Sequence, residues 1–493
     1  MSAKHTPPHT AGAHAAAAVP RYSLYALVVL SLVNFLNYID RQVLPAVATS
    51  LLADPELRLT DADIGFMEMS LLLSFTVLAP LFGRLGDRHP RAKLMAVAAV
   101  LWSIATGLTG VVDRLPFVSH EKGLSVPFFG TTLALSGVAV AFCAVRACVG
   151  VGESAYSTIT PSLIADYFPP HRRATALGVF QAAIPMGFAL GFVIGGVLAH
   201  FFGWRAAFMI VGVPGLLTAV LVWRLREPRR GATEEARPAS ALEEMAGAEA
   251  EAARGMSEAA GGRRESALRQ ALGILRTRDW LVSTAGYTML TAALGAFATW
   301  AIVVLVRDKG MSQTGANVTL GVVTLLAGAA GTFGGGWLSD RFAARRHNAY
   351  FLVCAVSTLL GVLPTLLVLV ADDPAVYLPC TFLAVALLFV SNAPFHAILL
   401  ESVPVGVRAL AVALNIVVIH ACGDAVSRAL VGVLSDSLKE GHFAALSALA
   451  SALGIDSARQ HLSTALLVAP ACLVASTVLF FVGAKLQKPA AAD

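Results

Sequence analysis

The chain repeatedly presents uncharged apolar stretches that are long enough to cross a lipid bilayer. Residues 94–112, 206–222 and 464–484 are examples, and a membrane-spanning helix needs roughly 20 apolar residues. Charged residues make up only 14% of the chain, whereas soluble domains carry about 25%. Because no soluble stretch is long enough to form a separate domain, the membrane part is expected to be the functional part.

The apolar stretches predict an all-α membrane protein with twelve transmembrane helices. The expected spans lie near residues 23–49, 62–83, 92–112, 129–153, 174–199, 204–223, 280–306, 315–338, 349–370, 376–400, 407–434 and 464–486. An even number of spans places both termini on the same side of the membrane.

The distribution of basic residues orients the chain. Most of the 36 Lys and Arg residues fall in segments on the side of the termini, and the positive-inside rule assigns that side to the cytoplasm. Arg outnumbers Lys and alanine is abundant, which is typical of GC-rich bacterial coding. We therefore expect a multi-pass protein of the bacterial inner membrane with both termini in the cytoplasm.

A charged segment rich in Ala, Glu, Arg and Gly separates spans six and seven. This composition predicts a solvated tether or a helix on the membrane surface rather than a catalytic domain. The predicted organisation is an N-terminal cytoplasmic tail, a first six-helix bundle, a cytoplasmic linker, a second six-helix bundle and a C-terminal tail, at residues 1–22, 23–223, 224–279, 280–486 and 487–493.

Two loops recur at matching places in the two halves. GRLGDRHPRAK follows span two and GWLSDRFAARR follows span eight, with the same spacing from Gly to Asp to Arg. A second pair, DYFPPHRRATAL after span four and ESVPVGVRALAV after span ten, places a proline three and an arginine seven residues after an acid. Two such coincidences indicate duplication of a six-helix unit.

The charges of these loops suit a cytoplasmic gate, because ionic contacts can break and form again as two halves rock. The alternative is that they only set topology and cap helices. The predicted gate consists of Asp87, Arg88, Arg91, Asp166, Arg173, Asp340, Arg341, Arg345, Glu401 and Arg408.

Four ionisable residues fall inside spans of the first half. Asp40 and Arg41 lie in span one, and Arg146 and Glu153 lie in span four. Ionisable residues within the membrane are costly, so they are expected to face the bundle interior. Seven residues are about two helical turns, which puts Arg146 and Glu153 on one face. We expect these four side chains to cluster, unless they form only a structural ion pair.

In this hypothesis Asp40 and Glu153 are the protonatable switches, because burial and nearby arginines act in opposite directions on a carboxyl group. Arg41 and Arg146 would hold the acids when these are ionised, or an anionic head group when they are protonated.

Span eleven carries a polar stripe at i, i+4 and i+8, formed by His420, Asp424 and Arg428. His420 could titrate near neutral pH and contact a head group, although a histidine on an inner face is often only a packing residue. Asp424 and Arg428 are expected to pair near an external gate, which Glu68 would join.

The loop GRLGDRHPRAK resembles the signature loop of the major facilitator superfamily. Within it, NYIDR at 37–41, GVGESAYSTITPSLIADYF at 150–168, AIPMGFALGFVIGG at 183–196 and REP at 226–228 look like the Spinster branch. The resemblance implies two pseudo-symmetric six-helix bundles around a central cavity, and transport of lysophospholipids or sphingosine-type lipids coupled to protons. Pro90 and Ala92 depart from the usual loop pattern.

A lipid substrate needs a polar end and an apolar wall. Tyr156 and Ser157 could add to the polar end. Aromatic residues predicted to line the cavity are Phe180, Phe188, Phe297, Trp300 and Phe395, although aromatic side chains that face lipid would give the same pattern.

The sequence predicts no enzyme, because HExxH, GxSxG, Walker and clustered metal-ligand patterns are all missing from it. We expect no metal, no cofactor besides the proton as coupling ion, and no nucleic-acid partner. A monomer surrounded by membrane lipids, carrying a small amphipathic lipid by alternating access, is the favoured interpretation. The alternatives are an exporter of drugs or organic anions, or, in another class, a channel or signalling protein.

Overall fold

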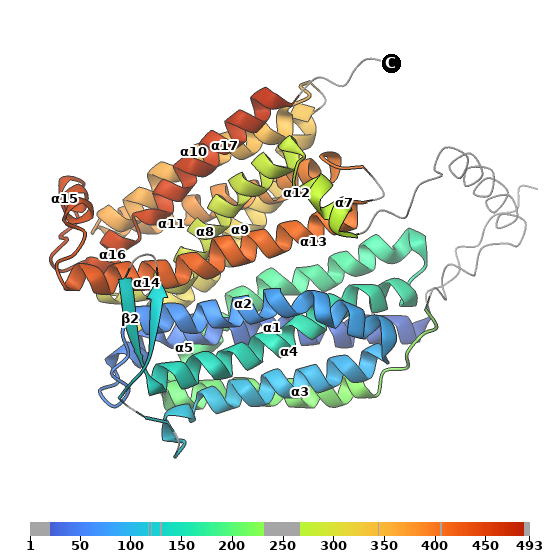
Figure 1. The fold of residues 1–493 in the computed structure, drawn as a ribbon, viewed down its shortest axis with the longest axis horizontal. Helices are drawn as coiled ribbons and strands as arrows, with labels where there is room; N and C mark the ends of the chain where they lie inside the picture. Colours follow the sequence, from blue (N-terminus) through green and yellow to red (C-terminus); the bar gives the residue numbers. More distant parts are fainter. Residues whose placement is uncertain are drawn as a thin grey trace, which may run out of the picture.

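A computed structural model describes residues 20–116, 118–119, 121–128, 131–230, 267–343, 345–404 and 407–487. Most of them are helical, and the helices form two bundles that follow each other along the chain (Figure 1). Residues 1–19 of the predicted tail, residues 231–266 of the predicted linker and residues 488–493 lie outside the described residues.

The first bundle consists of five continuous helices that make six crossings. They are α1 (Arg21–Ala53), α2 (Asp61–Arg88), α3 (Arg91–Thr109), α4 (Gly137–Tyr167) and α5 (Pro170–Trp223). α5 holds two crossings because Gly203 interrupts it with φ 81° and ψ 163°, a backbone conformation that is essentially restricted to glycine.

The second bundle also makes six crossings, and three of them are divided into shorter helical segments. The elements are α8 (Arg278–Arg307), α9 (Gln313–Ala343), α10 (Ala349–Val370), α11 (Pro374–Val390) with α12 (Asn392–Glu401), α13 (Arg408–Val418) with a π-helical segment (Ile419–Asp424) and α14 (Ala425–Lys439), and α16 (His461–Ala465) with α17 (Val468–Leu486). Short helices are α7 (Ala267–Ile274), α15 (Ala444–Ala452) and a 3-10 turn (Val112–Arg114).

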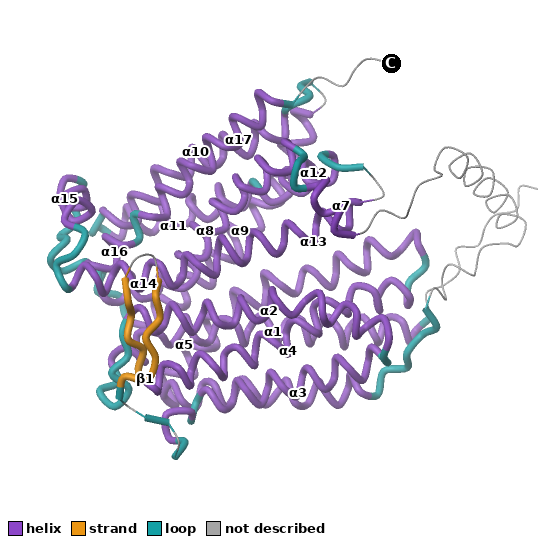
Figure 2. Tube along the Cα trace, in the orientation of Figure 1, coloured by secondary structure: helices purple, strands orange, loops and turns teal. Residues whose placement is uncertain are grey.

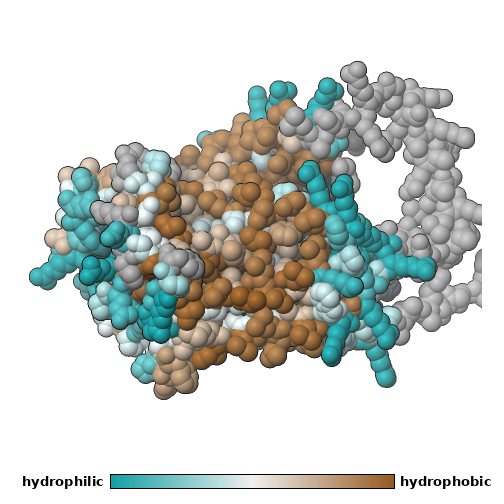
Figure 3. All heavy atoms as spheres, turned by 60° about the horizontal axis from the view of Figure 1, so that its bottom comes forward, coloured by the Kyte–Doolittle hydropathy of each residue, from teal (hydrophilic) through white to brown (hydrophobic). Residues whose placement is uncertain are grey.

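Eleven of the described helices are long and apolar enough to cross a membrane, and the longest of them contains both legs of α5. Figure 3 shows an apolar belt between two hydrophilic ends on the face in view. The predicted twelve-helix fold is therefore confirmed.

The only strands in the described part of the chain form a hairpin of β1 (Lys122–Phe128) and β2 (Thr131–Ser136) (Figure 2). The expected fourth span at 129–153 is wrong in its limits, because α4 begins at Gly137 and ends at Tyr167. The Ser136 side chain accepts the Ala139 amide and caps α4. An apolar window alone cannot separate a short strand from the start of a helix.

We call the end of the molecule with this hairpin the hairpin end, and the end where Trp223 and Arg278 border the linker the linker end. At the hairpin end the Phe128 ring packs edge-on against Phe66, 5.2 Å between centroids. α2 starts there with a capping box in which Thr60 and Asp63 bond each other's backbone and side chain, an arrangement that satisfies free amides of a helix start.

The bundles touch most closely where α2 of the first lies against α14 of the second. A Cβ at Gly65 would come 2.6 Å from the carbonyl oxygen of Arg428, and one at Gly432 would overlap the backbone of Asp61. Small residues permit this approach of two helix backbones. The contact aligns the charged side chains on the two helices.

Replacement of Gly203 tests the break in α5. Gly203→Ala should lower the stability of the purified protein by about 1–3 kcal/mol, because alanine strains at positive φ. Thermal unfolding in detergent measures the change. Gly178→Ala is the control, since Gly178 is helical in the same element with open space around its Cβ position; equal melting temperatures for the two variants would contradict the expected strain.

Candidate functional site

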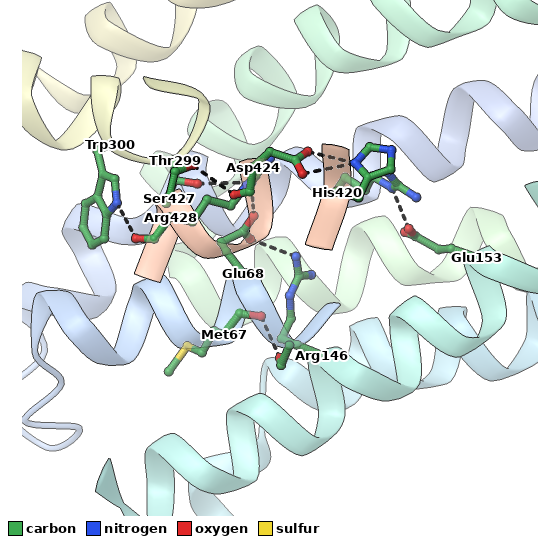
Figure 4. A network of polar contacts seen from close by, with 12 residues as sticks. Met67, Glu68, Arg146, Glu153, Thr299, Trp300, His420, Asp424, Ser427 and Arg428 are labelled. Atoms are coloured by element: carbon green, nitrogen blue, oxygen red, sulfur yellow. Dashed lines mark hydrogen bonds and ion pairs between the residues drawn. The ribbon is translucent and has the colours of Figure 1, made fainter. Parts of the chain in front are cut away.

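A network of charged side chains connects helices of the two bundles (Figure 4). It draws residues from α1, α2 and α4 of the first bundle and from the π-helical segment and α14 of the second. Because the low-dielectric interior penalises unpaired charge, the pairing of each group decides what the site can do.

Arg41 and Glu153 form one pair, with 2.6 Å between Arg41 Nε and Glu153 Oε2. The carboxylate is fully buried, while 13% of the arginine side chain is accessible. The guanidinium also lies over the rings of Tyr38 and Phe75, at 5.0 and 4.7 Å from their centroids. These cation–π contacts also stabilise the Arg41 guanidinium in this position.

Arg146 points to Glu68 rather than to Asp40 or Glu153, at 3.0 Å between Arg146 Nη2 and Glu68 Oε1. It lies two turns from Glu153 on the same helix, nearer the hairpin end, and α2 supplies the acid at that level. Its Nε and Nη1 atoms are buried and meet no acceptor in the described part of the chain.

Asp40 is buried and separate from these pairs. Its Oδ2 atom accepts a hydrogen bond from the Thr106 hydroxyl at 2.7 Å, and Oδ1 has no partner among the described residues. Consecutive residues of a helix project about 100° apart, so Asp40 faces α3 while Arg41 faces α4. The expected single cluster of four is therefore divided into three local contacts.

Glu68 also crosses to the second bundle. Its Oε2 atom lies 2.5 Å from Arg428 Nη1, and that guanidinium donates to Thr299 at 3.1 Å as well. The Trp300 indole donates to the Arg428 carbonyl at 2.9 Å and fixes the local backbone of α14. One carboxylate therefore bridges an arginine of each bundle.

The predicted pair of Asp424 with Arg428 is wrong. Asp424 bonds His420 at 3.1 Å, while Arg428 bonds Glu68. The π-helical segment ends at Asp424 and α14 begins at Ala425, so residues 424 and 428 keep their i, i+4 spacing. Arg428 instead meets the Glu68 carboxylate, which α2 places opposite it. The His420 ring lies edge-on to Phe75, 6.1 Å between centroids, so an aromatic contact connects it with Arg41.

A pocket of about 260 Å³ opens beside this network. Its charged lining residues are Asp424 and Arg428. Four threonines also line it, and apolar side chains of α5, α8, α9, α10 and α11 form the rest of its wall. Phe188 and Phe297 line it, as the sequence predicted.

The other three predicted aromatic residues do not line this pocket. Phe180, Trp300 and Phe395 are buried in the helix packing, and Phe395 stacks on Tyr287 at 3.7 Å between centroids. Aromatic residues on the inner and the packed faces of a helix are alike in sequence, so only the packing separates them.

The two polar residues expected near a head group lie within α4 packing. The buried Tyr156 hydroxyl donates to the Leu30 carbonyl, and its ring packs edge-on against Trp102. The Ser157 hydroxyl donates to the Ser154 carbonyl at 3.4 Å. Both side chains bond backbone carbonyls, which fits a packing role.

At the hairpin end, Asp61 is a fully buried acceptor that joins the bundles. It receives two hydrogen bonds of 3.0 Å from Arg307, one of 2.7 Å from Lys439 and one of 2.7 Å from Ser435. The sequence analysis missed this site. The signal was an acid at the start of span two, together with basic residues at the ends of spans seven and eleven.

At the linker end, the charges of the first bundle pair among themselves. Arg91 binds Asp166 at 2.7 Å and Glu227 at 3.2 Å, and Arg173 donates to the Ala165 carbonyl at 3.0 Å. Arg230 donates to the carbonyls of the α2 end, including that of Asp87.

The predicted gate residues of the second bundle do not meet this set. Asp340, Arg341, Arg345 and Glu401 are exposed and Arg408 is half-buried, and Arg88 of the first bundle is exposed too. In the part of the chain that the structure describes, the ion pairs that join the two bundles are those of Asp61 and Glu68, toward the hairpin end.

Two six-helix bundles with paired charges buried between them define a membrane transporter. The chain belongs to the Major Facilitator Superfamily, whose model matches residues 30–427. It is of the Spinster type, since it is 30% identical to spinster homolog 3 of Danio rerio over 435 residues, which is 85% of this chain and 78% of that protein.

Two other relatives carry related names. Protein spinster of Drosophila melanogaster is 29% identical over 430 residues, which is 85% of this chain but 63% of that longer protein. The sphingosine-1-phosphate transporter SPNS2 of Danio rerio is 29% identical over 446 residues, 87% of this chain and 79% of that protein. These relatives are transporters rather than enzymes.

Solved structures share the fold. A bacterial homolog of the human lysosomal transporter Spinster, in an inward-facing and occupied conformation, matches with a TM-score of 0.74 and 18% identity over 95% of this chain and 98% of that one. A D-xylose–proton symporter matches with a TM-score of 0.65 and 18% identity over 93% and 97% of the two chains.

Loss of the Asp61 charge should open the hairpin end. Asp61→Asn weakens the pairs of the buried Asp61 with Arg307 and Lys439, whose side chains are 35% and 40% accessible. Because ion pairs with a partly exposed member contribute about 1 kcal/mol, the separated population should rise roughly fivefold. Spin labels at the exposed positions Glu56 and Glu440, one in each bundle, report the distance.

Asp456→Asn is the matched control, because Asp456 is exposed and pairs with Arg459 inside the second bundle. An unchanged distance distribution in Asp61→Asn would mean that Asp61 does not hold the bundles together.

Proposed function

We propose that this transporter moves a lysophospholipid or sphingosine-like lipid by proton-coupled alternating access. The observation that carries the proposal is the pocket between the bundles, which has a charged end and an otherwise apolar wall. A small polar solute would make no apolar contacts with that wall. An amphipathic molecule can contact the wall with its apolar chain and the charged residues with its head group.

The apolar part suits an acyl or sphingoid chain. Phe188 of α5 and Phe297 of α8 face it from different bundles, and aliphatic residues such as Leu388 of α11 complete it. Arg428 at the polar end offers a guanidinium, which binds phosphate through several N–H donors. The names of the relatives, one of which is a sphingosine-1-phosphate transporter, support the same class of substrate.

Proton coupling is supported by the placement of Glu153 and Asp40. Each is a buried carboxyl group within a membrane-spanning helix, where ionised acids are costly and often functional. Protonation of Glu153 would free the accessible Arg41 guanidinium from its partner at 2.6 Å. Arg41 could then hold an anionic head group or allow the bundles to move.

Alternating access is supported by the unequal distribution of contacts between the bundles. The basic segments at the linker end favour its assignment to the cytoplasm, so that both termini are cytoplasmic in a bacterial inner membrane. In that orientation the ion pairs of Asp61 and Glu68 would close the external side. When the external side opens, the exposed charges at the linker end would form the cytoplasmic gate. We propose a monomer as the working unit.

Neutralising Glu153 should abolish coupling. In liposomes with labelled lysophospholipid, Glu153→Gln should lose the stimulation of flux by a pH gradient, because the side chain can no longer gain or lose a proton. Asp372→Asn is the control, since Asp372 is an exposed acid paired with Lys309. Full gradient-dependent transport by Glu153→Gln would remove Glu153 from coupling.

Filling the pocket should change chain-length selectivity. Ala384→Phe adds a ring to the wall, so lysophospholipids with long acyl chains should be transported several-fold more slowly while short-chain ones retain their rate. Competition between chain lengths in the same liposomes measures the shift. Equal slowing of all chain lengths, or of none, would contradict an acyl-chain site here.

A further inference from the structure

We propose that Glu68 is an internal counter-anion, which the anionic group of the substrate replaces at Arg428, so that substrate binding separates α2 from α14. This inference rests on the proposed lipid substrate and specifies how its charge acts on the contact between the bundles.

The first observation is that the two oxygen atoms of the Glu68 carboxylate bind different arginines. Oε1 binds Arg146 of the first bundle at 3.0 Å, and Oε2 binds Arg428 of the second at 2.5 Å. A single carboxylate thus shares one negative charge between two guanidinium groups, one in each bundle. A phosphate monoester presents more oxygen atoms and more negative charge than a carboxylate, so it is the stronger partner for the same arginines.

The second observation is the set of N–H donors that Glu68 leaves unused. Nε and Nη1 of Arg146 and Nε of Arg428 are buried without an acceptor in the described residues. A buried donor without a partner is unfavourable, and each guanidinium carries five N–H groups. The two arginines can therefore bind further hydrogen-bond acceptors in addition to the Glu68 carboxylate.

The third observation is access. Arg428 lines the apolar pocket, and 10% of its side chain is accessible, whereas Arg146 is fully buried. A head group entering from the pocket would meet Arg428 first. It could reach Arg146 only after Glu68 moves, which sets the order of the exchange.

The other groups at this end modulate the exchange. Asp424 lines the pocket beside Arg428 and repels an anion, but His420 holds it at 3.1 Å. Thr299 is uncharged, and its hydroxyl accepts a hydrogen bond of 3.1 Å from the Arg428 guanidinium. Arg428 is thus the pocket cation that an anion can approach, and Glu68 is the group it must displace.

Displacement acts directly on the packing of the bundles. Glu68 lies one turn from Gly65, where the backbones of α2 and α14 touch. Loss of the bond to Arg428 removes the inner ion pair of this contact and leaves those of Asp61 at its outer end. A bound anion would therefore lower the cost of opening the hairpin end.

The experiment compares two probes with the same chain, 1-oleoyl lysophosphatidate and uncharged 1-oleoylglycerol, on the full-length protein in nanodiscs. If Glu68 competes with the anion, Glu68→Gln should tighten lysophosphatidate binding by about fivefold or more and leave 1-oleoylglycerol binding unchanged. The readout is the ratio of the two dissociation constants.

Three variants keep the result interpretable. Glu68→Asp retains the charge and should keep a ratio near that of the wild type, and Arg428→Lys, which keeps charge but loses the planar donors, should reduce the preference for the anion. Asp61→Asn opens the same contact without touching Arg428, so it should move both affinities together and preserve the ratio.

An unchanged or reduced preference for lysophosphatidate in Glu68→Gln would overturn this inference while leaving the proposed lipid transport intact. A wild-type protein that binds neither probe would overturn the lipid substrate itself, and the role of Glu68 with it.

Discussion

Buried charge between two apolar bundles is the constraint on which this structure depends. A guanidinium or carboxylate that neither water nor lipid can solvate must find a partner within the protein. Arg41 finds one inside its own bundle, while Arg428 finds one across the interface. The first kind of pair stabilises a bundle, and the second kind stabilises one arrangement of the two bundles.

This difference explains why the contacts are unequal at the two ends. At the hairpin end, Gly65 and Gly432 allow two helix backbones to touch, and the acid Asp61 gathers donors from the opposite bundle. At the linker end, Arg91 is satisfied by Asp166 and Glu227 of its own bundle. Motion that breaks the first set would have to offer those charges new partners.

Much of the fold could be predicted because a membrane-spanning helix needs a long apolar stretch, which is visible in the sequence. The charged residues of the site were also visible, since Asp40, Arg41, Arg146 and Glu153 stand out in apolar surroundings. Their pairing was not visible, because it depends on which helix lies opposite each face. From the sequence, Glu68 was expected only to join an external gate, yet it is the residue that contacts an arginine in each bundle.

The sequence by itself determined the class of protein, the number of spans, the duplication and the identity of the charges in the membrane, all of which follow from local composition and spacing. Only the tertiary structure decided that Arg428 pairs with Glu68 rather than Asp424, and that α4 follows a β-hairpin. The physical reason is that the pairing of a charged side chain depends on which group lies opposite it, and that group belongs to a segment far away in the chain.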